Sequence, residues 1–192
     1  RAGADKVCLN TAAVRKPELI REAADRFGSS TIVVSIDALR TATGQYEVLV
    51  NYGREESGVE AVSWAIQACR LGAGELLVNC VNQDGTGKGF ELDLIREISI
   101  SVGVPVIAGS GAGQFQDIFE VLTTAKADAI SLASILHYEA CQRLSDPTTS
   151  YLEGNTDFLQ GARKPPAQIR PMSLPQIKEA LAAQRVPCRL QR

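Results

Sequence analysis

Residues 31–37 read Thr-Ile-Val-Val-Ser-Ile-Asp, a run of mostly β-branched side chains that ends abruptly in a carboxylate. A short, continuous apolar run of this kind is typical of a strand that is buried on both faces. Further short apolar runs of the same character follow or precede it, at residues 7–9, 76–78, 104–108 and 129–133. The sequence therefore predicts about five parallel strands at the centre of an α/β fold.

Segments with helical periodicity separate these runs. Apolar side chains recur at helical spacing in residues 17–27, 59–71, 92–102, 115–124 and 174–184. An alternation of strands and helices fits two architectures, an incomplete (β/α)8 TIM barrel or an open doubly wound sheet. Periodicity alone leaves both of these fold classes open.

Two segments interrupt the alternation. Residues 45–50 alternate polar and apolar side chains, which predicts an exposed strand or hairpin after the second core strand. Residues 145–172 contain several prolines and no periodic apolar pattern, so we expect a surface insertion without a core of its own. We predict that residues 1–192 form one domain, a partial barrel that carries this insertion.

The composition excludes several classes of function. The chain has 192 residues, a net charge of -2 and 45% hydrophobic residues, which gives no basis for nucleic-acid binding. No apolar run is long enough to span a membrane, and we predict no membrane contact. The five cysteines are scattered and only one His is present, which argues against a metal site, and no cofactor is predicted. We expect Cys8 and Cys80 to be buried, reduced thiols in the cytoplasm, or in a plastid if the source is a plant or alga.

Polar residues directly follow each apolar run, at positions where packing in a hydrophobic core would disfavour them. Because the carboxyl ends of parallel strands meet on one face, we expect these groups to converge in space. Asp37 is the candidate for proton transfer, with helix capping as the alternative interpretation. Asn10 could bind substrate or cap the following helix, and the sequence does not decide between these roles. His137 and Cys80 are interpreted as structural residues.

Two glycine-rich loops suit a phosphate group. Residues 109–113 read Gly-Ser-Gly-Ala-Gly between a strand and a helix, where backbone N–H groups can approach an anion. The alternative is that these glycines only form tight turns. Ser134 opens the next helix and could contribute in the same way. The loop at residues 84–89 could cover a ligand with Thr86 and Lys88, or it could be an ordinary turn.

Five motifs in order resemble the cyclase subunit family of imidazole glycerol phosphate synthase. Residues 3–13 (GADKVCLNTAA) and 33–40 (VVSIDALR) are similar to its fourth-strand and fifth-strand motifs. The sixth, seventh and eighth motifs are matched by residues 72–77 with 84–90 (GAGELL and DGTGKGF), 105–113 (PVIAGSGAG) and 133–137 (ASILH). The resemblance runs from Gly3 to about Tyr138 and returns over residues 177–190. It implies a (β/α)8 barrel and favours that fold over the doubly wound sheet.

The resemblance also implies an activity and its partners. The family uses ammonia to convert a ribulosyl-formimino aminoimidazole carboxamide nucleotide to imidazole glycerol phosphate and aminoimidazole carboxamide ribotide, a lyase step of histidine biosynthesis. The ammonia comes from a glutaminase subunit or a fused glutaminase domain, and the small-molecule substrate carries two phosphates. By position, Asp37 matches a catalytic carboxylate. The phosphate-binding positions correspond to Asn10, Thr11, Gly85, Thr86, Ser110, Gly111, Ala133 and Ser134. The partner face and ammonia gate correspond to Asp5, Lys6 and Glu75.

The sequence also departs from the family pattern. The other catalytic Asp belongs to a first strand that these residues do not include, so we expect an N-terminal half-barrel of about three βα units to be missing and the chain alone to be inactive. Asn82 stands where an Asp is expected, and the insertion is foreign to the pattern. Two alternative functions are an isomerase-like barrel of the same pathway and a non-catalytic remnant that binds a phosphate ligand or a partner.

Overall fold

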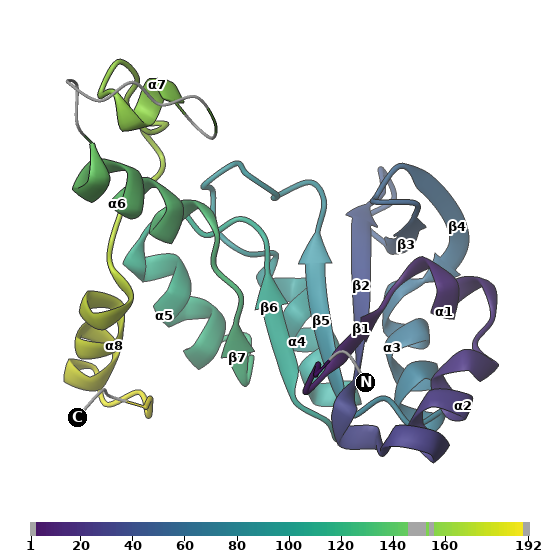
Figure 1. Cartoon of the computed structure of the whole chain (residues 1–192). Coiled ribbons are helices and arrows are strands. Elements are labelled where there is room, and N and C mark those ends of the chain that lie inside the picture. Colours follow the sequence, from purple (N-terminus) through teal and green to yellow (C-terminus); the bar gives the residue numbers. More distant parts are fainter. Residues whose placement is uncertain (1–2, 146–152, 154–155, 190–192) are drawn as a thin grey trace.

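The computed structural model describes residues 3–145, 153 and 156–189 of the chain. Its centre is an open, mostly parallel sheet flanked by helices (Figure 1). The five parallel strands are β1 (Val7–Leu9), β2 (Ile32–Arg40), β5 (Glu75–Cys80), β6 (Val106–Gly109) and β7 (Ala129–Ile130). The prediction of about five parallel strands is confirmed, and the sheet does not close on itself.

Strand β2 organises the sheet because its two edges pair with three strands. Its β5 edge runs in register from Val33 opposite Glu75 to Ala38 opposite Cys80. The other edge is shared: β1 pairs with its first half, and β3 (Tyr46–Val50) pairs with its second half in antiparallel sense. β3 continues into β4 (Glu55–Glu60), which forms a hairpin with it. The carboxyl end of β2 therefore lies between the hairpin and β5.

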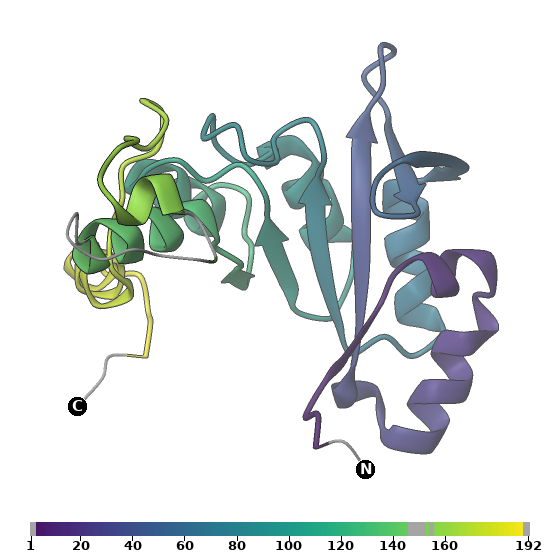
Figure 2. The ribbon, with the colours of Figure 1, turned by 45° about the horizontal axis from the view of Figure 1, so that its top comes forward.

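Helices follow the strands in the order that a βα repeat requires. The described residues form eight α-helices: α1 (Thr11–Arg15), α2 (Glu18–Phe27), α3 (Ala61–Arg70), α4 (Leu92–Ser101), α5 (Phe115–Thr123), α6 (Ser134–Leu144), α7 (Thr156–Leu159) and α8 (Leu174–Ala183). A short 3-10 helix, η1 (Ser29–Thr31), precedes β2. Figures 1 and 2 show α3 and α4 packed against the same side of the sheet.

The hydrophobic core lies between this sheet and these helices. Alternate residues of β5, Leu76, Val78 and Cys80, are buried against the helix layer, because successive side chains in a strand point to opposite faces. Trp64 of α3 and Ile98 of α4 fill the same core. The other alternate residues of β5 are only partly buried, and they face the side that carries the polar groups.

Several sequence-based expectations need correction. Residues 45–50 contain a strand of a hairpin, as predicted, but β3 is largely buried and not exposed, because Tyr46 and Val48 belong to the core that Trp64 fills. The predicted helix over residues 59–71 begins only at Ala61, since the residues before it extend the hairpin as β4. The strand expected at residues 129–133 is just two residues long. Cys8 is exposed, because no described element covers its side of β1.

The described part of the predicted insertion packs against helices α5 and α6. Phe158 of α7 is buried and stacks 4.9 Å from the ring of Tyr138 in α6. Ile169 is also buried, in a second core cluster with Ile118 and Ile135. The remaining residues of that prediction, 146–152 and 154–155, lie outside the described residues. Among the elements that the structure describes, no helix has the length and apolar character that crossing a bilayer requires.

Candidate functional site

Asp37 lies in the second half of β2, three residues before the strand ends at Arg40, and two carboxamide side chains hold it there. Asn10 Nδ2, at the end of β1, donates to Asp37 Oδ2 over 2.9 Å. Asn79 Nδ2, at the same level on β5, donates to Asp37 Oδ1 over 2.9 Å. Each carboxylate oxygen thus has one fixed donor and keeps further lone pairs for a ligand. These two hydrogen bonds fix the orientation of the carboxylate.

The site has no room for a larger residue beside Asn79. Gly109 of β6 pairs with Asn79, and a Cβ atom placed on Gly109 would lie 2.1 Å from Asn79 Oδ1. Glycine at this position therefore allows the Asn79 side chain to extend toward Asp37. The first glycine of the predicted phosphate loop thus has a packing role in addition to any ligand contact.

Beside Asn79 lies a polar pocket of about 150 Å³. Its walls are residues from the loops that follow β5, β6 and β7: Asn79, Asp84, Gly85, Gly87, Ser110, Gly111, Ala112, Ser131, Ala133 and Ser134. The predicted phosphate residues Gly85, Ser110, Gly111, Ala133 and Ser134 are brought together here. Because Asn79 both lines the pocket and binds Asp37, the carboxylate and the pocket share one rim.

The two glycine loops pack backbone against backbone. A Cβ atom on Gly111 would lie 2.1 Å from the carbonyl oxygen of Gly89, and Gly89 N donates to Gly111 O over 2.9 Å. Ser110 adopts a φ of 69°, a left-handed conformation that is uncommon for residues other than glycine. Such conformations are costly and cluster where a site requires them.

Thr86 is the one predicted residue of this group that does not line the pocket. Its hydroxyl donates to the carbonyl oxygen of Gln83 over 2.7 Å, so its proton is used within the loop. Lys88 is exposed nearby. Asp84, at the start of the same predicted loop, does line the pocket. Any anion bound there must therefore be compensated by N–H and O–H donors.

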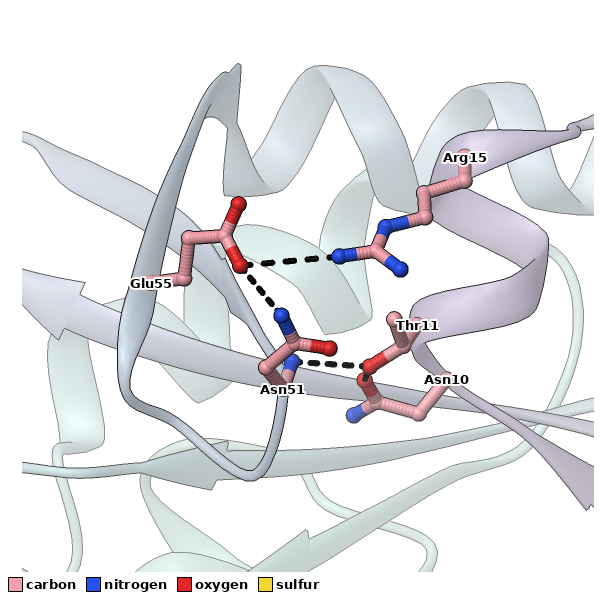
Figure 3. A network of polar contacts seen from close by, with 5 residues as sticks. All are labelled: Asn10, Thr11, Arg15, Asn51 and Glu55. Atoms are coloured by element: carbon pink, nitrogen blue, oxygen red, sulfur yellow. Dashed lines mark hydrogen bonds and ion pairs between the residues drawn. The ribbon is translucent and has the colours of Figure 1, made fainter.

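The second predicted phosphate position, at Asn10 and Thr11, is built differently (Figure 3). The Asn10 side chain makes no capping hydrogen bond to α1, so its polar contact is with Asp37. Thr11 Oγ1 donates to Asn10 Oδ1 over 3.2 Å and accepts from the backbone N–H of Asn51 over 2.9 Å. Glu55 accepts from the Asn51 side chain and lies 3.5 Å from Arg15 Nη2.

The residues predicted for the ammonia gate lie at the opposite end of the strands. Lys6 Nζ contacts Glu75 Oε1 at 2.8 Å and donates to the carbonyl oxygen of Ser30 at 2.8 Å. Asp5 is exposed beside them. Glu75 precedes Asn79 by four residues on β5, so the pair lies about 13 Å below the rim at roughly 3.3 Å per residue.

Buried groups around the hairpin support the site without facing it. Tyr46 Oη donates to the buried carboxylate of Glu91 over 3.0 Å, and Arg40 lies 3.6 Å from the same oxygen. Burial, with the Glu91 contact, raises the pKa of Tyr46. Burial likewise raises the pKa of the Cys80 thiol, which supports its interpretation as a packing residue. Asn82, at the position where an Asp was expected, accepts from the Arg40 N–H over 2.7 Å and ties β2 to the loop after β5.

Asp84, Gly87 and Ala112 lie in the two loops predicted to contact a ligand, and Asn79 is one of the polar residues predicted to converge, but none of the four was assigned an individual role; Ser131 was not predicted as a site residue. Asn79 carried a usable signal, because it is a polar residue at the end of an otherwise apolar strand. The others are small or loop residues whose approach depends on how three loops pack together. Within the described residues, no group of three or more His, Cys, Asp or Glu side chains is placed to hold a metal ion.

The fold and the site define first a class of protein. It is an α/β protein with a mostly parallel, unclosed sheet that gathers its polar side chains at the carboxyl ends of its strands. The family model described as "Histidine biosynthesis protein" matches residues 1–142. The chain belongs to this family, whose fold is a (β/α)8 barrel, and its open sheet is an incomplete form of that barrel.

Three bacterial relatives are similar to most of the chain, and each is named "Imidazole glycerol phosphate synthase subunit HisF". The protein of Symbiobacterium thermophilum is 55% identical over 137 residues, which is 71% of this chain and 54% of the relative. The protein of Streptomyces avermitilis is 50% identical over 138 residues (72% and 55%), and that of Trichormus variabilis is 52% identical over 141 residues (72% and 55%). The chain therefore spans about half the length of these curated relatives.

Proposed function

We propose that the natural protein containing these residues is a cyclase of histidine biosynthesis. It would use ammonia to convert the ribulosyl-formimino aminoimidazole carboxamide nucleotide to imidazole glycerol phosphate and aminoimidazole carboxamide ribotide. The observation that carries the proposal is the Asp37 carboxylate, fixed between Asn10 and Asn79 on the same rim as the pocket of Ser110 and Ser134. The name that the three relatives share supports the same activity.

The substrate would bind through its two phosphates. One phosphate would occupy the pocket, where Gly85, Gly111, Ala133 and the hydroxyls of Ser110 and Ser134 surround it. Thr86 would act indirectly, by holding the shape of the loop. The other phosphate would lie beside Asn10 and Thr11, across Asp37. Since the Thr11 hydroxyl already donates to Asn10, contacts there would come from backbone N–H groups.

Asp37 would move protons during ring closure. A carboxylate within hydrogen-bond reach of the reacting atoms can accept a proton in one step and return it in another. The carboxamides of Asn10 and Asn79 cannot exchange that proton, so they hold the acid–base group without competing with it. The resemblance assigns the second carboxylate to a strand outside these residues. A chain restricted to these 192 residues would then lack half of the acid–base pair, and we expect it to be inactive alone.

Ammonia would arrive from the opposite end of the strands. We propose that a glutaminase subunit or fused domain docks there, near Asp5, and that the pair of Lys6 and Glu75 gates the passage. The distance of 2.8 Å between Lys6 and Glu75 supports this role, because the pair would have to part for a small molecule to pass. The five cysteines are free thiols, which supports a reducing compartment such as the cytoplasm or a plastid.

The test is ammonia-dependent turnover of the substrate by the natural protein in full. We expect Asp37→Asn to lower kcat by at least a thousandfold, because an amide cannot transfer the proton. Asp93→Asn, a matched change at an exposed position of α4, should leave kcat within twofold. Full activity of Asp37→Asn would contradict the proposal, and turnover without any ammonia would favour the isomerase-like alternative.

A further inference from the structure

Three hydrogen bonds form a continuous chain from the β3–β4 hairpin to Asp37, and all of them point the same way. Figure 3 shows the first two, which join Asn51, Thr11 and Asn10. The backbone N–H of Asn51 donates to Thr11 Oγ1, and the Thr11 hydroxyl donates to Asn10 Oδ1. Asn10 Nδ2 then donates to Asp37 Oδ2. Donors aligned in one direction polarise each other, and here the alignment ends on the carboxylate.

These hydrogen bonds determine the orientation of the Asn10 carboxamide. Turned one way, Asn10 presents its NH2 group to Asp37 at 2.9 Å, and turned the other way it presents an oxygen to an oxygen. Its Oδ1 atom faces Thr11 because the Thr11 hydroxyl supplies a proton there. A hydroxyl has only one proton to give, so Thr11 can orient Asn10 or donate to a ligand, but not both.

The turn of the β3–β4 hairpin holds the Thr11 side chain in place. Asn51, Tyr52 and Gly53 all adopt positive φ values of 52°, 63° and 71°. The turn thereby points the Asn51 N–H at Thr11, while the Asn51 side chain is held by Glu55. Tyr52 at the tip is 92% exposed, so neighbouring side chains do not hold this turn by packing around Tyr52.

We propose that Thr11 is a positioning residue for Asp37, and that its hydroxyl, anchored by the Asn51 turn, sets the orientation of the Asn10 carboxamide. This inference rests on the proposed proton transfer by Asp37. In this arrangement the Thr11 hydroxyl positions the acid–base group, and the backbone N–H groups of the same segment bind the phosphate. Loss of the hydroxyl therefore acts on kcat, whereas loss of a phosphate ligand acts on KM.

The kinetic test compares Thr11→Val with Thr11→Ser in the natural protein. Valine keeps the shape and removes the hydroxyl, so we expect kcat to fall about tenfold to a hundredfold with KM within twofold of the parent value. Serine restores the hydroxyl and should return kcat to within threefold. Thr123→Val is the matched control, since its hydroxyl donates only to a carbonyl oxygen within α5. A KM increase without a kcat loss, or failure of serine to rescue, would overturn the proposal.

A second measurement needs no turnover. The side-chain amide of Asn10, followed by NMR in the 192-residue chain, should show one proton shifted by the Asp37 carboxylate. That shift should disappear in Thr11→Val and persist in Thr11→Ser and Thr123→Val. Its persistence in Thr11→Val would overturn the inference even if Asp37 is catalytic. An inactive Asp37→Asn together with an unperturbed Thr11→Val would leave the proposed function standing and remove only this inference.

Discussion

Gly109→Ala should disturb the Asp37 carboxylate through the side chain of Asn79. The added Cβ would lie 2.1 Å from Asn79 Oδ1, whereas real Cβ contacts are essentially never closer than 3.0 Å, so the oxygen must retreat by about 0.9 Å. Nothing in the β6 backbone opposes alanine, so the strain falls on the Asn79 side chain. Turning that side chain gives up its 2.9 Å bond to Asp37. A hydrogen bond to a charged group contributes about 1.5–3 kcal/mol, so we expect that loss in the free energy of unfolding.

Urea denaturation of the 192-residue chain measures this effect. Gly103→Ala is the matched control, because its added Cβ meets nothing within 4 Å and should change stability by no more than about 1 kcal/mol. In an Asn79→Ala background, Gly109→Ala should cost less than about 0.5 kcal/mol, because the colliding atom is gone. Equal costs in the two backgrounds would refute the reasoning, since the strain would then not pass through Asn79.

Three further predictions concern the scaffold. Glu60→Ala removes the N-cap of α3 and should cost about 1 kcal/mol at pH 7 by thermal denaturation. Burial acts to raise the pKa of Glu60, but the backbone hydrogen bonds that its carboxylate accepts outweigh burial and lower the pKa. The contribution of Glu60 to stability is therefore present above pH 4.5 and should fade as the solution is acidified below that value. Tyr46→Phe should cost about 1–2 kcal/mol by urea denaturation, because the buried Glu91 loses a donor; an unchanged midpoint would contradict this. Gly74→Ala should be more damaging than Gly109→Ala in the same assay, because its Cβ would lie 2.1 Å from the backbone oxygen of Ser29, which no side-chain rotation can relieve; equal midpoints would contradict this.

The strand-forming runs could be predicted because burial on both faces leaves a direct mark on composition. The run that ends at Asp37 forms β2, and the expectation that Ser110 and Ser134 gather at one end follows from parallel strand direction alone. The hairpin was harder to read. β3 is buried because it covers the edge of β2, and that pairing depends on a register that no local pattern records.

The support of Asp37 could not be predicted from the sequence for a similar reason. Asn10 and Asn79 lie 69 positions apart, and both reach Asp37 only because β1 and β5 flank the same strand. Glycine is needed at position 109 because the Asn79 side chain occupies the space that a Cβ atom would fill, and not because of any local turn. The prediction that Cys8 is buried was wrong, because apolar neighbours in the sequence do not indicate which edge of the sheet is covered.

The central claim is that loops from three strands and the Asp37 carboxylate share one site. An NMR titration of the 192-residue chain with inorganic phosphate tests it directly. We predict that the backbone amides of Gly85, Gly111 and Ser134 and the side-chain amide of Asn79 shift together along one saturation curve. Shifts confined to a single loop, or to residues at the Lys6 and Glu75 end, would contradict the account.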